Sequence, residues 1–249
     1  MKSMTKKLEI KIHDCAGRFG KLENLETPNI LSERDGKIAP DIGAAYDVPR
    51  EIAIWSVKKT IAKAKKCVNS ADIAVIQGSK YIDLRVKTAV ELENIGYNGF
   101  LIANGDNLLL HPRDLVDLVV SLRESLNPNS YLVFPFSEPS FIPLLSYMGV
   151  DLFLEGIGEY YSYLNVLLTP TKNYDLNKYK LFEISQKNLL KRNNKNVEFV
   201  LNEVREHIKN GTLRNLVEER SFTSPQNTIA LKLLDKNHQD YLQNYTQLY

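Results

Sequence analysis

The sequence has little cysteine, and its two cysteines, Cys15 and Cys67, stand far apart. Two cysteines are too few for a disulfide scaffold, and the Cys-x-x-Cys spacing of many zinc and redox proteins is missing. The four histidines are scattered, without the spacing of metal ligands. We therefore expect no metal and no cofactor, and a reducing cytoplasm as the setting.

Long apolar runs and an excess of one charge are also missing. No segment approaches the roughly 18 consecutive apolar residues that span a bilayer, and the Lys-rich start leads into an alternating segment, unlike a signal peptide. The 32 basic and 30 acidic residues give a net charge of +2, which indicates no global attraction to nucleic acid but leaves local basic patches open. A Gly-x-Ser-x-Gly elbow and glycine-rich phosphate loops are absent, so neither serine hydrolases nor nucleotide-binding folds are supported.

What the sequence does contain is a regular alternation of short apolar runs and amphipathic segments. With 249 residues, 43% of them hydrophobic, the chain can bury a large core. We expect strands at residues 8–12, 73–76, 100–102, 131–134 and 152–153. We expect helices at residues 50–67, 84–95, 112–126 and 139–148. This alternation predicts parallel βαβ units, as an α/β barrel or an open doubly wound sheet.

Two stretches break the alternation. A turn is expected at residues 17–20 and a long connection at residues 27–49, which holds three prolines. After Thr169-Pro170 the chain becomes rich in Asn and Lys, with helices expected at 176–192, 197–209, 213–220 and 228–235. We predict an α/β unit over residues 1–170 and a C-terminal helical extension over residues 171–249. The mixed charges of the extension favour a solvated surface, and a phosphate-binding role stays open.

Polar residues or glycines follow the expected strands, where functional groups of α/β proteins lie. These ends read Gln77-Gly78, Asn104-Gly105-Asp106, Pro135-Phe136-Ser137 and Glu155-Gly156. An amide at a strand end offers both a donor and an acceptor, and a glycine lets a ligand approach the backbone. Ordinary turns are the competing interpretation. Asp41 and Asp47, in the long connection, are candidate ligand carboxylates, although the default interpretation of Asp47 is that it caps the next helix.

A series of short motifs resembles the tRNA-guanine transglycosylase superfamily. The motifs lie at residues 17–22 with 27–28, 41–49, 56–60, 75–78 with 83–85, 101–104, 149–153 and 211–218. Each is weak alone, but their order covers nearly the whole chain. The resemblance implies a TIM-like (β/α) barrel, shortened relative to tRNA-guanine transglycosylase, with a C-terminal helical segment.

The resemblance also implies a base-binding pocket. A base-recognising aspartate falls in the segment 41–49, and we assign it to Asp47, together with Gln77, Gly78, Asn104 and Gly105 as the predicted substrate-binding residues. A carboxylate accepts two parallel hydrogen bonds, which suits the N1–H and exocyclic amine of a guanine-like base.

Departures from the superfamily pattern argue against base exchange. The aspartate nucleophile is expected after Asp-Leu-Phe, where this sequence has Leu154, which cannot form a covalent glycosyl intermediate. Glu155 comes next, but neighbouring strand residues point to opposite faces of a sheet. The zinc motif is missing, and the segment between Thr27 and Asp41, which carries a general base in the superfamily, is shortened. We assign no catalytic residue.

Two segments, at residues 112–116 and 147–153, resemble archaeosine synthases more than they resemble base-exchange enzymes. That family adds lysine to the nitrile of 7-cyano-7-deazaguanine in the D-loop of archaeal tRNA, before a radical-SAM enzyme completes archaeosine. Its Pro-Cys and Lys-Pro-Tyr motif and its PUA domain do not occur here. The resemblance therefore implies one subunit of a hetero-oligomeric transferase, whose partner subunit carries those parts. The alternative is a noncatalytic subunit that docks tRNA or dimerises.

Overall fold

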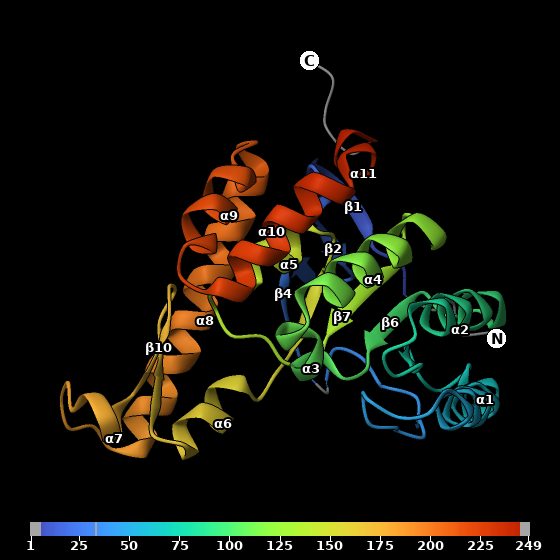
Figure 1. Cartoon of the computed structure of the whole chain (residues 1–249), viewed down its shortest axis with the longest axis horizontal. Helices are drawn as coiled ribbons and strands as arrows, with labels where there is room; N and C mark the ends of the chain where they lie inside the picture. The colour runs from blue at the N-terminus through green and yellow to red at the C-terminus, as the bar shows by residue number, and fades with distance from the viewer. Residues whose placement is uncertain (1–5, 33, 245–249) are drawn as a thin grey trace.

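A computed structural model describes residues 6–32 and 34–244, and its centre is a parallel sheet with the strand order β4-β8-β7-β6-β5 (Figure 1). These strands are β4 (Asn29–Leu31), β5 (Ile73–Ile76), β6 (Gly99–Ile102), β7 (Tyr131–Phe134) and β8 (Leu152–Leu154). The parallel pairing confirms the predicted α/β fold. Of these five parallel strands, β4 was not predicted, because it lies inside the expected long connection.

Successive side chains along each parallel strand point alternately into two cores. Val75, Leu101 and Val133 belong to an inner cluster of buried side chains, whereas Ile76 and Phe134, one position further along their strands, belong to a larger cluster under the helices. Both faces of the sheet are thus buried. This explains why the strands read as continuous apolar runs rather than as apolar and polar residues in turn.

The sheet curves toward a barrel. Strand β4 forms one edge and β5 the other, and Ile38 makes an isolated parallel bridge to Ile73 of β5. The chain from β4 to Ile38 therefore runs from one edge of the sheet to the other. The inner cluster fills the ring that results, as in a shortened TIM-like barrel.

A three-stranded antiparallel sheet adds Leu22 to the inner cluster, and Leu8, just before its first strand, belongs to the same cluster. The sheet consists of β1 (Glu9–Asp14), β2 (Gly17–Leu22) and β3 (Leu25–Thr27). The turn expected at residues 17–20 is wrong, because this segment lies within β2 and the turn comes just before it. Gly20 instead allows β1 and β2 to lie close together, since a Cβ at this position would lie 2.3 Å from the Glu9 carbonyl oxygen.

A buried ion pair joins this sheet to the barrel. Arg18 Nε donates to Asp151 Oδ1 at 2.9 Å, and Arg18 Nη2 donates to Asp151 Oδ2 at 2.5 Å. Asp151 Oδ2 also accepts a hydrogen bond from the Leu132 amide at 2.8 Å. The carboxylate thus satisfies groups from two sheets, as a buried charge requires.

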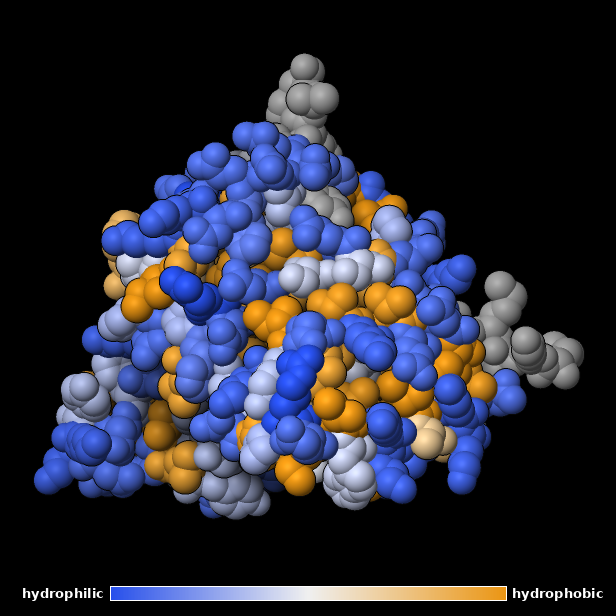
Figure 2. Space-filling view, turned by 45° about the vertical axis from the view of Figure 1, so that its right-hand side comes forward, coloured by the Kyte–Doolittle hydropathy of each residue, from blue (hydrophilic) through white to orange (hydrophobic). Residues whose placement is uncertain are grey.

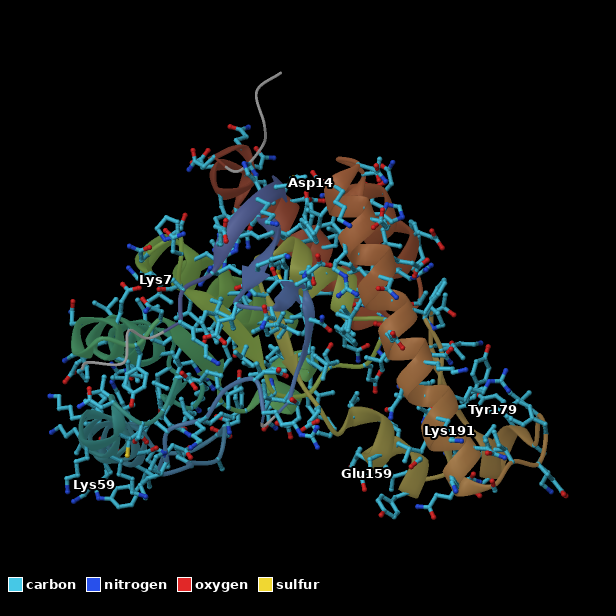
Figure 3. The ribbon with its side chains drawn as sticks, turned by 180° about the vertical axis from the view of Figure 1, so that it is seen from behind. Lys7, Asp14, Lys59, Glu159, Tyr179 and Lys191 are labelled. Atoms are coloured by element: carbon cyan, nitrogen blue, oxygen red, sulfur yellow. The ribbon has the colours of Figure 1, made fainter. Side chains whose placement is uncertain are left out.

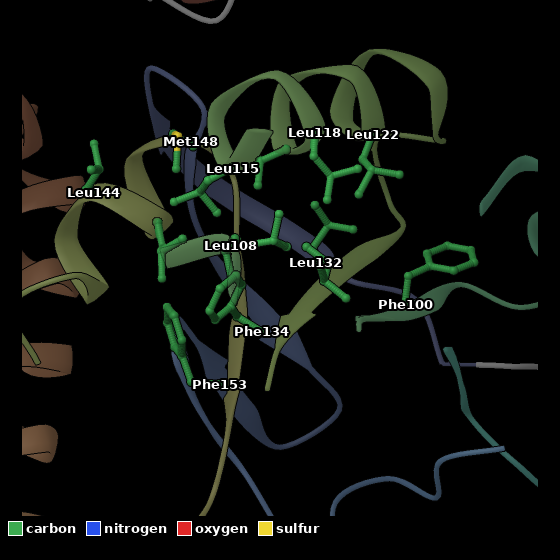
Figure 4. Close-up of a cluster of buried hydrophobic side chains, with 14 of the residues drawn as sticks. Phe100, Leu108, Leu115, Leu118, Leu122, Leu132, Phe134, Leu144, Met148 and Phe153 are labelled. Carbon is green, nitrogen blue, oxygen red and sulfur yellow. The ribbon is translucent and has the colours of Figure 1, made fainter. Parts of the chain in front are cut away.

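Helices cover the outer face of the barrel. The predicted helices are present as α1 (Arg50–Cys67), α2 (Ile82–Ile95), α4 (Pro112–Ser125) and α5 (Ile142–Tyr147). Figure 4 shows Leu115, Leu118 and Leu122 of α4 against Leu132 and Phe134 of β7. Two short helices, α3 (Gly105–Leu110) and α6 (Ile157–Tyr163), were not predicted, since about two turns carry little periodic signal.

The C-terminal part is helical, as predicted, but its first half differs. Besides α7 (Leu176–Tyr179), it has one helix, α8 (Gln186–Lys209), where two were expected. The Asn-rich segment 193–196 continues this helix because its amides bind an unpredicted hairpin of β9 (Val166–Leu168) and β10 (Asn173–Asp175). Three further helices follow within the described residues: α9 (Leu213–Ser221), α10 (Pro225–Asn237) and α11 (Gln239–Asn244).

The surface is mixed in character. On the face in Figure 2, apolar residues gather near the middle among hydrophilic ones. A shallow groove between α2 and α4 is lined by Ile82, Val86 and Val90, with Asp83, Glu91 and Glu124 beside them. Within residues 6–32 and 34–244, no helix is both long and apolar enough to cross a membrane.

Candidate functional site

The carboxyl ends of the parallel strands meet at one end of the barrel, and Gln77 lies there, directly after β5. Its side chain is almost entirely buried, with 2% exposure. Gln77 Nε2 donates a hydrogen bond to Asp41 Oδ2 at 2.6 Å. Gln77 Oε1 and the nearby Ser79 Oγ are buried without a hydrogen-bond partner among the described residues. Buried polar atoms are rarely left unpaired, which makes these two atoms candidates for contact with a ligand.

Helix α1 holds Asp41 beside Gln77. Ser56 Oγ donates to the Ile42 carbonyl oxygen at 2.5 Å, and Thr60 Oγ1 accepts a hydrogen bond from the Ile42 amide at 3.0 Å. Lys63 Nζ donates to the carbonyl oxygen of Asp41 at 3.1 Å. Three side chains on successive turns of one helix thus fix the backbone of the irregular segment that carries the carboxylate.

Gly78 allows a buried arginine to fasten the ends of β5 and β6. Its φ of +149° suits glycine, and a Cβ there would lie 2.7 Å from Arg85 Cγ. Arg85 is 1% exposed and donates to the carbonyl oxygens of Ser79 and Ala103 at 2.6 and 2.9 Å. Burial lowers the pKa of Arg85 to about 10, so the guanidinium still carries its charge at neutral pH.

Asn104 and Gly105 form a tightly packed corner after β6. Asn104 has a φ of +57°, accepts a hydrogen bond from Arg85 Nη2 at 3.1 Å and donates one to the Ala44 carbonyl oxygen at 3.0 Å. A Cβ on Gly105 would lie 2.6 Å from Pro135. The predicted Asn-Gly turn therefore ties the end of β6 to the segment that carries Asp41.

Asp47 lies apart from Gln77. Its carboxylate is 79% exposed and pairs with Lys80 at 2.6 Å. This hydrogen bond lowers the pKa of Asp47. Among the carboxylates of the irregular segment, Asp41 is the one bonded to Gln77. Sequence reasoning weighed both aspartates, but no local signal separates them.

Asp47 lines a cavity of about 620 Å³ that adjoins this corner. The rings of Tyr46 and His111 stack there, with centroids 4.7 Å apart. The Tyr46 hydroxyl donates to Asp114, and burial, followed by this hydrogen bond, raises the pKa of Tyr46 well above its usual range. Tyr46, His111 and Asp114 were not among the predicted site residues, because they come from a connection and from helix ends without any motif.

Leu154 lies at the carboxyl end of β8 and packs against the inner cluster, so it occupies the inner wall of the barrel. The next residue, Glu155, is exposed, and its amide donates to the Leu31 carbonyl oxygen at 3.2 Å. Leu154 and Glu155 both line a cavity of about 570 Å³ at the barrel mouth. The inner wall therefore presents a hydrocarbon side chain at this position. Across the part of the chain that the structure describes, no group of three or more His, Cys, Asp or Glu side chains is placed to hold a metal ion.

Known proteins resemble this chain along most of its length. It is 32% identical over 188 residues to an archaeosine synthase from Methanocaldococcus jannaschii, a match that covers 75% of this chain and 30% of that protein. It is 30% identical over 261 aligned residues to a tRNA-guanine(15) transglycosylase from Pyrococcus furiosus, covering 92% of this chain and 44% of the relative. The chain thus spans less than half the length of either relative.

A family model gives the assignment. The model described as queuine tRNA-ribosyltransferase matches residues 25–188, which include all five parallel strands, Asp41, Gln77 and Leu154. The match also runs past residue 170, where we predicted the C-terminal extension to begin. The chain therefore belongs to the queuine tRNA-ribosyltransferase family.

Proposed function

We propose that this chain is the transglycosylase-like subunit of an archaeosine synthase that modifies tRNA. In this proposal it binds 7-cyano-7-deazaguanine in the D-loop while lysine is added to the nitrile. The observation that carries the proposal is the buried, unpartnered Oε1 of Gln77 beside the Asp41 carboxylate. Together they offer acceptors to the N1–H and exocyclic amine of a guanine-like base. Gly78, Asn104 and Gly105 would shape the same pocket, whereas Asp47, exposed and paired with Lys80, would stay outside it.

Leucine at position 154 fits this chemistry. Base exchange breaks the glycosidic bond and needs a carboxylate nucleophile. Addition to a nitrile leaves that bond intact: a lysine amine forms a bond to the nitrile carbon, one π bond of the nitrile opens, and a proton moves from the amine to the nitrile nitrogen. There is no leaving group, so a hydrocarbon wall at Leu154 does not prevent the reaction.

Asp41→Asn tests the pocket, with Asp47→Asn as a matched control. The asparagine amide would place an N–H donor against the N–H donors of the base, and two donors cannot form a hydrogen bond. We therefore expect kcat/KM for tRNA carrying 7-cyano-7-deazaguanine to fall roughly 10- to 100-fold. Transfer of radiolabelled lysine to the tRNA measures the effect in the presence of the partner subunit. Asp47→Asn should change kcat/KM less than about 3-fold, because the exposed pair with Lys80 contributes little. If Asp41→Asn is as active as the unaltered chain, the pocket is assigned wrongly.

We further propose that a partner subunit carries the Pro-Cys and Lys-Pro-Tyr motif and the PUA domain, and that a radical-SAM enzyme acts next. Lysine transfer should then need both subunits, and full activity of this chain alone would contradict the division. A noncatalytic docking subunit is the alternative. It predicts that crystals soaked with 7-cyano-7-deazaguanine show no base at Gln77 and that Asp41→Asn leaves the activity of the complex unchanged.

A further inference from the structure

Helix α1 concentrates positive charge that the chain as a whole lacks. Between Arg50 and Cys67 it has one arginine and five lysines against one glutamate, a net charge of +5, whereas the whole chain has +2. The other residues therefore sum to −3. A local cationic surface of this kind attracts a polyanion without any global positive charge.

Lys58, Lys59 and Lys66 are exposed on the side of α1 that faces away from the barrel, whereas Lys63 lies on the inner side and bonds the Asp41 carbonyl oxygen. The inner side, through Ser56 and Thr60, holds the segment next to Asp41. We call the opposite side the outer face of α1. It consists of the exposed residues Glu51, Ile52, Trp55, Lys58, Lys59, Ala62 and Lys66. Figure 3 shows Lys59 at the outer edge of the molecule.

Several cations on the outer face lack a counterion. Arg50 pairs with Asp83, and Lys65 lies 3.5 Å from Glu91. By contrast, Lys58, Lys59 and Lys66 form no ion pair with any described residue. The apolar groove between α2 and α4 differs in this respect, since three acidic residues and one lysine, Lys87, border it. Charge complementarity therefore favours the outer face of α1 as the place for phosphate groups.

Aromatic rings accompany these cations. Trp55 is 50% exposed on the outer face. At the start of α1, the Arg50 guanidinium carbon lies 5.0 Å from the centre of the Tyr81 ring, and Lys80, which pairs with Asp47, lies 5.9 Å from it. This cluster of cations and an aromatic ring thus lies between the cavity at Asp47 and the start of α1, and Trp55 follows further along the helix. Proteins bind unpaired RNA with this combination, in which rings stack on bases and cations contact phosphates.

We propose that the outer face of α1 binds the ribose-phosphate backbone of the tRNA beside the nucleotide held at the barrel mouth, with Trp55 stacked on an unpaired base. The proposal rests on the proposed function, since it takes tRNA as the substrate. It gives α1 two tasks on opposite sides. The inner side positions Asp41 for the base, and the outer face holds the strand that carries the base.

Trp55 is the only tryptophan in the chain, so its fluorescence reports on this face alone. The full chain is titrated with an unmodified tRNA transcript, and base stacking should quench the emission. Affinity is measured in parallel by anisotropy of labelled tRNA. Trp55→Ala should weaken binding roughly 5- to 100-fold through the loss of one stacked base. An unquenched Trp55 in a protein that binds tRNA would overturn the proposal.

Salt dependence separates phosphate contact from other effects. Lys58→Gln with Lys59→Gln should make the slope of log affinity against log salt shallower by about 1.5 between about 50 and 200 mM, because two phosphate contacts are lost. Lys232→Gln with Lys236→Gln is the matched control, since both are exposed on α10 and the charge change is the same. Equal slopes for the two double variants would overturn the proposal.

These outcomes keep the two proposals distinct. If the unaltered chain binds tRNA and the α1 variants bind it equally well, the inference on α1 fails while the proposed function stands, and the outer face is then available to a protein partner. If the α1 variants lose tRNA affinity while Asp41→Asn leaves lysine transfer unchanged, only the base pocket fails. No binding of tRNA by the unaltered chain would overturn the inference on α1, and the proposed function is then decided by lysine transfer in the presence of the partner subunit.

Discussion

At the scale of single residues, Arg85 shows how the site is held. Its buried guanidinium bonds carbonyl oxygens after both β5 and β6, as well as the side chain of Asn104. A lysine ammonium is a point charge and lacks the planar fork that reaches all three. Arg85 is thus a positioning residue for the strand ends that carry Gln77 and Asn104.

Replacing Arg85 by methionine should destabilise the protein. The carbonyl oxygens of Ser79 and Ala103 would stay buried without donors, so we expect the free energy of unfolding to fall by about 2–3 kcal/mol. Urea denaturation followed by circular dichroism measures the change. Lys87→Met, on the exposed side of the same helix, should stay within about 0.5 kcal/mol. Equal stability of the two variants would show that the bonds of Arg85 contribute nothing.

At the scale of elements, α8 depends on a contact distant in sequence. Asn193 Oδ1 accepts a hydrogen bond from the Leu168 amide at 2.9 Å, and Asn193 Nδ2 donates to the Val166 carbonyl oxygen at 3.0 Å. The side chain is fully buried. Asparagine has a low propensity for the interior of a helix. Here both of its side-chain polar groups form hydrogen bonds to the hairpin, which offsets this low propensity.

Asn193→Ala should loosen the hairpin of β9 and β10. Two buried backbone groups would lose their partners, so we expect a loss of about 1–3 kcal/mol in the free energy of opening there. Hydrogen exchange should rise at residues 166–175 and stay unchanged in the parallel sheet. Lys195→Ala, exposed on the same helix, serves as the control. Exchange that rises equally in the sheet would mean that the contact supports the whole fold rather than the hairpin.

At the scale of the whole molecule, the family fold is present, and the position at which the resemblance places the nucleophile is a leucine. Leu154 packs on the inner cluster at the end of β8. Strand β8 is paired on both sides, with β4 and β7. The strand that carries this position is therefore paired along both edges, while position 154 has a hydrocarbon side chain that cannot act as a nucleophile.

Guanine exchange should accordingly be undetectable. With radiolabelled guanine and tRNA, we expect incorporation on the order of 10⁴-fold or more below that of an active transglycosylase, because a missing nucleophile costs about that much. The tRNA-guanine(15) transglycosylase from Pyrococcus furiosus is the positive control. Exchange that persists in this chain and is abolished by Glu155→Gln would show that Glu155 replaces the aspartate.

The sequence by itself determined the order of parallel strands and helices around the barrel. The predicted bounds of residues 50–67, 73–76 and 131–134 agree with α1, β5 and β7, because these segments are buried against their neighbours in sequence and repeat their apolar residues regularly. It also placed Gln77 and Asn104 at strand ends. The assignment of these residues to a substrate pocket stays a prediction.

Only the tertiary structure decided how distant segments meet. The choice of Asp41 rather than Asp47 as the carboxylate beside Gln77 depends on bonds from α1 to an irregular segment that has no period of its own. The continuity of α8 likewise depends on a hairpin that is distant in sequence. Leu168 of this hairpin bonds Asn193 of α8, 25 positions further along the chain. Periodicity records which face of an element is buried. It does not record which polar groups, far apart in the chain, satisfy one another once the barrel has formed.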